Sequence, residues 1–290
     1  MPLPAGVLPF EVAGFACSGL DWVARLLALH PHVAVVEAAD PLGPLGDGTC
    51  TVGRAVPPPA DFAERVQRAL AGKPAAKRVG AVLPTGVRAE LGPDRIVVVR
   101  DGRDVLVHWT LRQLRAQGPV LRSFLAKSPQ DCRIPELVRR FAADPDDVLV
   151  RNRGLLLADY EWLRYGAYLW SEAMDDHFGA LAWDSDHPSG ERWPFTLHFE
   201  AARKEVRATF DELCTWLELD PSLVPPFATE DPVAAATTDP VTLAEWEVGV
   251  WPRWFTKRAS KLFKMDGGPG LDSLAQCTFD DSWEGECPPA

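Results

Sequence analysis

The sequence predicts an α/β fold, a three-layer sandwich in which helices flank a central, mostly parallel sheet of the P-loop nucleotide-binding type. Two observations support this prediction. Apolar, β-branched stretches alternate along the chain with segments whose apolar residues repeat at helical spacing. In addition, "VAGFACSGLDW" at residues 12–22 places a small-residue turn between an apolar strand and an apolar helix, with Gly14 and Gly19 at the Gly-x-x-x-x-Gly spacing of a phosphate loop.

The elements follow in order. We expect a strand in residues 10–16, a helix from Leu20 that ends before Pro31, and a second strand that ends at Glu37. Residues 38–60 are rich in Gly and Pro and indicate a loop. The later segments predict a helix in 59–72, strands in 78–84 and 94–100, a helix over about 103–115, mainly helix in 119–190, a strand in 193–200 and one helix over 201–219.

The composition of the chain argues against several classes of function and of site. The net charge of -11 argues against a nucleic-acid binder, and no apolar run is long enough for a membrane span. The six cysteines form no Cys-x-x-Cys pair, so we expect neither a zinc site nor a disulfide framework. The N-terminus lacks the features of a secretion signal, which favours a cytoplasmic protein and leaves an organelle address open. We expect one domain in residues 1–265 and an acidic, turn-rich tail in 266–290.

Four segments carry a resemblance to a known family. Residues 16–23, "ACSGLDWV", lie between a strand and a helix that ends at "HP", and residues 100–108, "RDGRDVLVH", follow a later strand. "LHFEAARKEVRATFDELCTWLELD" and "VGVWPRWFT" come after them. In this order, the segments resemble the sulfotransferases that use 3'-phosphoadenosine 5'-phosphosulfate (PAPS).

The resemblance implies transfer of a sulfuryl group from PAPS to a hydroxyl of a small or medium-sized acceptor, leaving 3'-phosphoadenosine 5'-phosphate (PAP), without a metal. Helix N-termini suit phosphate because their amides are unpaired. The first segment would therefore bind the 5'-phosphosulfate and the adenine through Cys17, Ser18, Gly19, Leu20, Asp21 and Trp22. Arg100 and His108 would hold the 3'-phosphate, a task for which the fixed donor fork of arginine is suited.

The resemblance also indicates a base. Sugar-modifying and bacterial sulfotransferases carry a glutamate shortly after the His-Pro that ends the first helix. Glu37 lies near that place, seven residues past His30. Its carboxylate would take the proton of the acceptor hydroxyl. His108 is a second candidate catalytic residue.

The sequence departs from the family pattern at several places. Cys17 replaces the loop cation, and Leu20 and Asp21 replace paired threonines. Val82 stands where cytosolic members have a catalytic histidine, and residues 244–246 replace an Arg-Lys-Gly phosphate clamp. The sequence does not choose which residue supplies the lost charge; the candidates are Arg25, Lys73, Lys77 and Arg78.

These departures leave alternatives open. A catalytically inactive protein of the same fold, kept as a scaffold or complex subunit, is the main rival to the enzyme. A phosphate-loop kinase fits poorly, since Lys and Ser/Thr are missing after Gly19. Individual residues have simpler interpretations too: Ser18 as a helix cap, Asp21 as a favourable first-turn acid, and Trp22 as core. The partner is a small-molecule acceptor, with a homodimer or a complex left open.

Overall fold

The computed structural model describes residues 3–37, 60–84, 94–116, 119–127, 133–183 and 193–266. These residues form two compact units. The first holds 3–37, 60–84, 94–100 and 193–247, and the second holds the other described residues, up to 266. The predicted loop at 38–60 and the tail at 266–290 lie almost wholly outside the described residues. The single-domain interpretation stays a prediction.

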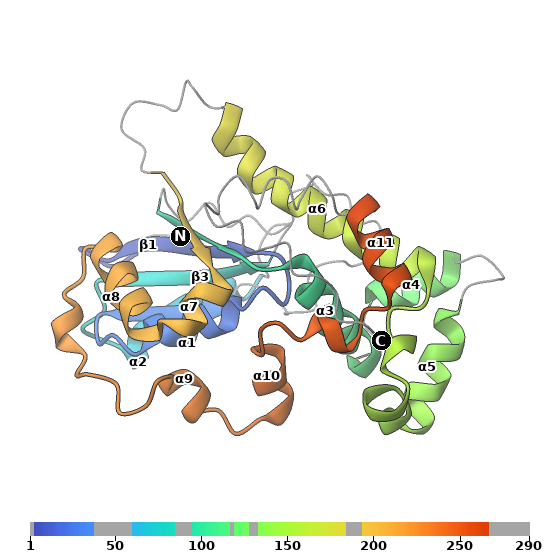
Figure 1. The fold of residues 1–290 in the computed structure, drawn as a ribbon. Helices are drawn as coiled ribbons and strands as arrows, with labels where there is room; N and C mark the ends of the chain where they lie inside the picture. Colours follow the sequence, from blue (N-terminus) through green and yellow to red (C-terminus); the bar gives the residue numbers. More distant parts are fainter. Residues whose placement is uncertain are drawn as a thin grey trace. The chain divides into compact units, whose positions relative to one another are not determined.

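The first unit contains a five-stranded parallel sheet, in the order β2-β3-β1-β4-β5. Its strands are Leu8–Gly14 (β1), Val33–Glu37 (β2), Arg78–Pro84 (β3), Arg95–Val99 (β4) and Phe195–His198 (β5). Its helices are Leu20–Ala28 (α1), Phe62–Gly72 (α2), Phe199–Lys204 (α7), Val206–Trp216 (α8), Pro221–Leu223 (η4), Pro232–Ala235 (α9) and Pro240–Glu245 (α10) (Figure 1). The predicted helix over 201–219 is wrong in one respect, since Glu205 separates α7 from α8.

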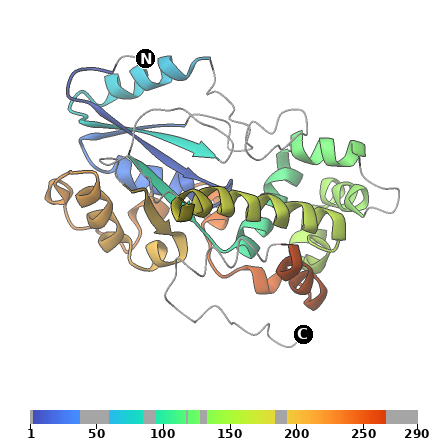
Figure 2. The ribbon, with the colours of Figure 1, turned by 90° about the horizontal axis from the view of Figure 1, so that it is seen from above.

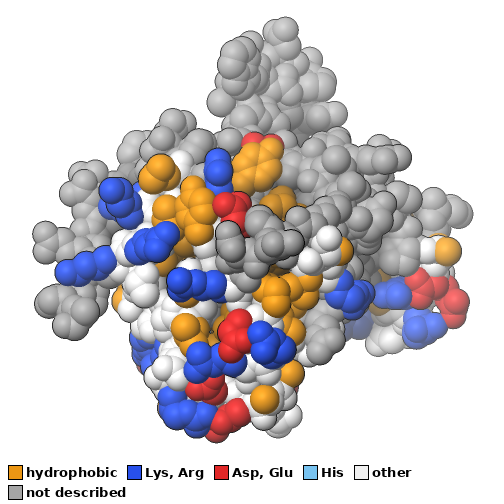
Figure 3. All heavy atoms as spheres, turned by 90° about the vertical axis from the view of Figure 1, so that its right-hand side faces the viewer, with side chains coloured by type: hydrophobic (Ala, Val, Ile, Leu, Met, Phe, Trp, Pro, Cys, Tyr) orange, Lys and Arg blue, Asp and Glu red, His pale blue; other side chains and the backbone are white. Residues whose placement is uncertain are grey.

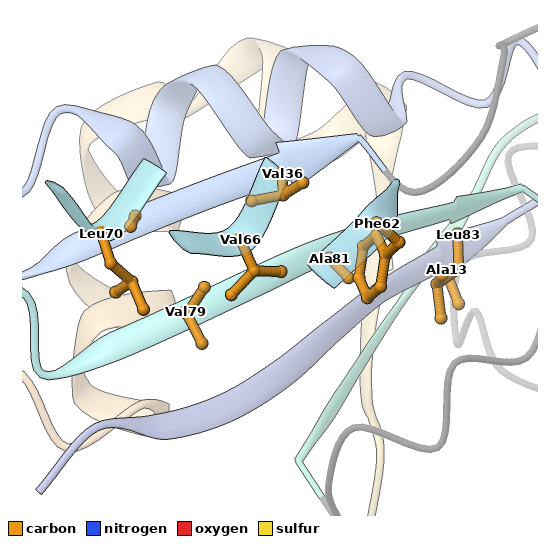
Figure 4. Packing of buried hydrophobic residues seen from close by; sticks show 9 residues of the cluster. Ala13, Val36, Phe62, Val66, Leu70, Val79, Ala81 and Leu83 are labelled. Atoms are coloured by element: carbon orange, nitrogen blue, oxygen red, sulfur yellow. The ribbon is translucent and has the colours of Figure 1, made fainter. Parts of the chain in front are cut away.

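Helices cover both faces of this sheet, so the predicted three-layer arrangement is confirmed. Helix α2 packs Phe62, Val66 and Leu70 onto one face, against Val79 and other apolar side chains of the strands (Figure 4). Helix α1 lies on the opposite face, with α8 packed against it (Figure 2). The two crossovers therefore lie on opposite faces, as right-handed connections require when the chain moves from β1 to the edge strand β2 and then back to β3.

The second unit is helical where it is described. Its elements are Gly102–Ala116 (α3), Pro119–Lys127 (α4), Ile134–Ala143 (α5), Asp147–Arg151 (η2), Arg153–Leu155 (η3), Tyr160–Trp183 (α6), Trp251–Arg253 (η5) and Lys257–Asp266 (α11). Tryptophans join the helices: Trp109 of α3 stacks on Trp162 of α6 with ring centroids 4.7 Å apart, and Trp170 of α6 packs against Phe263 of α11. No described helix is both long and apolar enough to span a bilayer.

Candidate functional site

The loop between β1 and α1, residues 15–19, lies where the sheet changes direction. The connection from β1 leads toward β2, whereas β4 lies on the other side of β1. Ligands of open α/β sheets bind at the carboxyl ends of the strands at such a switch point. Gly14 at the end of β1 pairs with Val98 of β4, and the Arg100 Nη1 donates to the Cys17 carbonyl at 3.0 Å. The two strand ends that carry the predicted site therefore lie together.

The start of α1 has the features of an anion site. Gly19 is the residue before the helix, with a left-handed φ of 94°, and no side chain caps the helix. By helix geometry, the amides of residues 20–22 have no acceptor within α1. Ser18 is completely buried, and its Oγ has no hydrogen-bond partner. Ser18 is therefore not the helix cap, and its orphaned hydroxyl lies in the loop that the sequence assigns to a phosphosulfate.

The side chains of Asp21 and Trp22 form hydrogen bonds with the segment that contains α9 and α10. The Asp21 carboxylate accepts the indole N–H of Trp246, with both oxygens 3.2 Å from Nε1. Trp22 is completely buried and donates to an Oδ of Asp231 at 3.1 Å. Asp21 is thus a favourable first-turn acid with an internal donor, and its carboxylate is engaged away from a ligand. The burial of Trp22 leaves no exposed ring face, so adenine stacking stays a prediction.

Helix α7 contributes two residues that the sequence analysis did not single out, Phe199 and Arg203. The Phe199 ring packs on the loop so closely that a Cβ at Gly19 would lie 2.1 Å from it, and it meets Trp22 edge-on at 5.7 Å. One helical turn later, the Arg203 guanidinium lies 5.4 Å from the Trp22 ring centroid. The signal available in the sequence was their i, i+4 spacing just after a strand that ends at the same sheet edge.

Arg203 is a half-buried cation at the start of α1. It forms an ion pair with Asp231, and its Nε is buried without a hydrogen-bond partner. Burial, and next the neighbouring charge of Arg100, lower the pKa of its guanidinium. A lowered pKa means that the surroundings disfavour the charged form, so a bound anion would relieve this cost. Arg203 is therefore a cation near the start of α1 that the four candidates from the sequence did not include.

The structure places those four candidates elsewhere. Lys73 donates to the carbonyls of Ala28 and His30 at the carboxyl end of α1, the end away from the loop. Lys77 and Arg78 lie at the start of β3, which is level with Leu8, about 20 Å from Gly14 along the strand. Arg25 is bound to Thr237 and stacks over Trp246. Lys73, Lys77 and Arg78 therefore lie far from a ligand at the β1–α1 loop.

Arg100 is fully buried and makes internal hydrogen bonds. Its Nη1 donates to the carbonyls of Cys17 at 3.0 Å and Glu245 at 2.7 Å, and its Nη2 donates to the Glu247 carbonyl. Its guanidinium also lies 4.8 Å from the Phe199 ring centroid. These bonds tie the segment after α10 to the loop. In this arrangement, three main-chain oxygens accept hydrogen bonds from the Nη atoms of Arg100.

Three other predicted site residues, His108, Cys17 and Leu20, are all buried. His108 is buried in α3, in the second unit, so its joint role with Arg100 stays a prediction. Asp104 of the same helix accepts the amides of Gly249 at 2.6 Å and Trp251 at 2.8 Å, which fixes the turn before η5. Cys17 and Leu20 are buried in or beside the loop, and Cys17 forms no disulfide with another described residue.

Glu37 ends the edge strand β2. It pairs with Val82 of β3, which in turn pairs with Val12 of β1, so its backbone lies two strands, or about 10 Å, from β1. It is at the same carboxyl edge as the loop. The side chain of Glu37 lies outside the described part of the chain, and its role as a base stays a prediction.

The two ends of PAPS fit these residues differently. At the phosphosulfate end, the orphaned Ser18 hydroxyl, the first amides of α1 and the orphaned Arg203 Nε suit an anion. At the 3'-phosphate end, the Nη1 and Nη2 atoms of Arg100 already donate to main-chain carbonyls, so a phosphate would compete with these carbonyls for the Nη donors. Within the described residues, no three His, Cys, Asp or Glu side chains gather in a way that could hold a metal ion.

The sheet order, the loop after β1 and the helix that follows define an α/β fold of the phosphate-loop nucleotide-binding type. The chain is similar to mouse sulfotransferase SULT7A1 complexed with PAP, with 11% identity, a TM-score of 0.45, and coverage of 94% of this chain and 89% of that one. It is also similar to a retinol dehydratase in complex with retinol and PAP, with 12% identity, a TM-score of 0.40, and coverage of 93% and 82%. No protein-family model and no curated protein matches the chain.

Proposed function

We propose that the protein is a sulfotransferase that moves a sulfuryl group from PAPS to a hydroxyl of a small or medium-sized acceptor. The observation that carries this proposal is the pair of orphaned, buried donor atoms at the start of α1, Ser18 Oγ and Arg203 Nε. Buried polar groups almost always have partners, and a ligand is one of the few reasons for an exception. Both groups favour an anion, because one can donate a hydrogen bond and the other belongs to a cation.

PAPS would supply the activated sulfuryl group. Ser18, the amides of residues 20–22 and Arg203 would bind its sulfate-bearing end and neutralise its charge, which is the main demand of such a transfer. Phe199 and Trp22 exclude water from this region because both are buried. Glu37 would accept the proton of the acceptor hydroxyl, since the edge strand β2 ends beside the loop's sheet edge.

Binding of PAP tests the cofactor site. We expect calorimetry to show micromolar binding, and Arg203→Ala to weaken it about tenfold or more, because a charge-assisted hydrogen bond contributes about 1.5–3 kcal/mol. Arg203→Lys should retain part of the affinity, since it keeps the charge without the planar fork. Lys204→Ala is the matched control, because Lys204 is the exposed neighbour on α7. Equal affinity in Arg203→Ala and the wild type would remove Arg203 from the site.

Transfer of labelled sulfate from PAPS to a panel of phenols and sugars tests the base. We expect Glu37→Gln to lower the transfer rate about 100-fold or more, the usual contribution of a general base. The affinity for PAP should stay unchanged, because the proposed base contacts the acceptor. An unchanged rate in Glu37→Gln would mean that another group takes the proton.

A second candidate function is a catalytically inactive protein that keeps the fold as a scaffold or complex subunit. The bonds of Arg100 to three carbonyls favour it, because they commit the Nη donors of this buried arginine to contacts within the chain. The same calorimetry separates the two candidates: no heat of binding at millimolar PAP would support the scaffold and end the enzymatic proposal.

A further inference from the structure

Helix α11, in the second unit, carries an unbalanced positive charge. Within Lys257–Asp266, the four cations Lys257, Arg258, Lys261 and Lys264 are all exposed. None of the four forms an ion pair or hydrogen bond with another described residue. On the face drawn in Figure 3, side chains of Lys, Arg, Asp and Glu stand among hydrophobic ones, so the charge of α11 is taken from its residues. We call these four side chains the basic face of α11.

Other helices of the same chain balance their charges. Helix α2 pairs Arg68 with Glu64 at 2.7 Å, and α8 pairs Arg207 with Asp211 at 2.9 Å, each four residues apart. In α11, the cations at 257, 261 and 264 have one another as i, i+4 and i, i+3 neighbours, which is unfavourable by about 0.2–0.5 kcal/mol per pair. A cation at the start of a helix costs further stability, and Lys257 and Arg258 both lie in the first turn.

The apolar side of α11 holds the helix in place and is not available for another partner. Ala259 and Phe263 are buried, and Phe263 packs against Trp170 and Phe255 with centroids 5.7 and 6.0 Å away. Met265 is the exception, with 65% of its surface exposed beside Lys264. The exposed side of α11 is therefore a row of cations about 10 Å long with one apolar side chain at its end.

The sequence that follows α11 has complementary chemistry. Between residue 265 and the end of the chain there is no Lys, Arg or His, and the acidic residues are Asp266, Asp272, Asp280, Asp281, Glu284 and Glu286. Phe279 and Trp283 stand among these carboxylates in the sequence, so the segment carries apolar groups as well as negative charge. The 13 residues 267–279 span up to about 40 Å when extended, so the chain is long enough to return along α11.

We propose that the basic face of α11 binds the acidic segment 272–286 of the same chain. Covalent linkage supplies millimolar effective concentration, so weak individual ion pairs suffice for occupancy. An anionic membrane or a long polyanion is disfavoured, because it would extend past α11 and approach other parts of a chain whose net charge is -11.

Two measurements on the full chain test this. Carbodiimide coupling in a mixture of isotopically heavy and light chains should join Asp280, Asp281 or Glu284 to lysines of α11 within one chain, in preference to Lys73, Lys77 and Lys204.

The second measurement is cleavage by a glutamate-specific protease after Glu284 and Glu286. The cleavage rate should rise about fivefold or more in the triple variant Arg258→Glu/Lys261→Glu/Lys264→Glu. It should also rise in high salt, because salt screens the ion pairs. Arg65→Glu/Arg68→Glu on α2 should leave it unchanged.

Each contrary result overturns the proposal in a distinct way. Couplings spread evenly over all lysines, or equal cleavage in the α11 variant and the wild type, would mean that the segment does not bind this face. Heavy-to-light couplings would assign the face to a second copy. Co-sedimentation of the full chain with phosphatidylserine vesicles, lost in the α11 variant, would assign it to a lipid surface.

Discussion

Arg100→Met is expected to lower the free energy of unfolding by about 3–5 kcal/mol, as removal of one member of a buried charged network does. The substitution keeps the length and apolar stem of the side chain but leaves the Cys17 and Glu245 carbonyls without their donor. Each buried acceptor that loses its partner costs about 1–3 kcal/mol. The favourable contact between the guanidinium and the Phe199 ring is also lost.

Urea denaturation followed by circular dichroism measures this effect. Arg68→Met on α2 is the matched control, because its guanidinium is exposed and paired with Glu64 on the surface, and it should cost less than about 1 kcal/mol. A loss below about 1 kcal/mol in Arg100→Met would show that the carbonyl contacts contribute little.

The result also bears on function, since Arg100 cannot serve the carbonyls and a 3'-phosphate with the same donors. If Arg100→Met is strongly destabilising, a 3'-phosphate that took the Nη donors of Arg100 would have to offset the loss of its bonds to the carbonyls. PAP would then bind little better than adenosine 5'-phosphate. The 3'-phosphate role of Arg100 thus depends on the cost that the denaturation experiment measures.

The sequence analysis predicted the five strands because their signals are local, although β1 lies two residues earlier than predicted and residues 199–200 of the last predicted strand belong to α7. The strand at 78–84 has the predicted bounds, and the strand that follows Pro31 ends at Glu37 as expected. Apolar runs and proline breaks act within a few residues, so they can be recognised without tertiary information. The order of motifs along the chain likewise indicated which strand ends would lie together, and the pairing of Gly14 with Val98 confirms it.

The site was harder to predict because its partners are distant in sequence. Asp21 and Trp246 are 225 positions apart, and Arg100 is 145 positions from Glu245. A periodic pattern along the sequence indicates local structure and does not indicate contacts between residues this far apart. Phe199 and Arg203 were missed for the same reason, since their importance comes from the packing of α7 on the start of α1. The break at Glu205 that separates α7 from α8 adds to this, because residues 201–219 show one continuous amphipathic pattern.

Gly19→Ala is expected to lower the free energy of unfolding by about 2–5 kcal/mol, the sum of two costs. A φ of 94° disfavours any residue with a Cβ, at about 1–2 kcal/mol. The new Cβ would also lie 2.1 Å from the Phe199 ring, so the ring and α7 would have to shift, and such overpacking costs about 1–3 kcal/mol.

Two other glycines separate these costs in the same denaturation experiment. Gly6 has a φ of 83°, and a Cβ added there would have nothing within 4 Å, so Gly6→Ala carries the backbone cost alone. Gly72, the last residue of α2, has open space and no left-handed φ, and Gly72→Ala should be neutral or slightly stabilising. If Gly19→Ala cost no more than Gly6→Ala, Phe199 would move aside freely. Helix α7 would then not be fixed against the loop, and Arg203 could not be a preorganised cation at the start of α1.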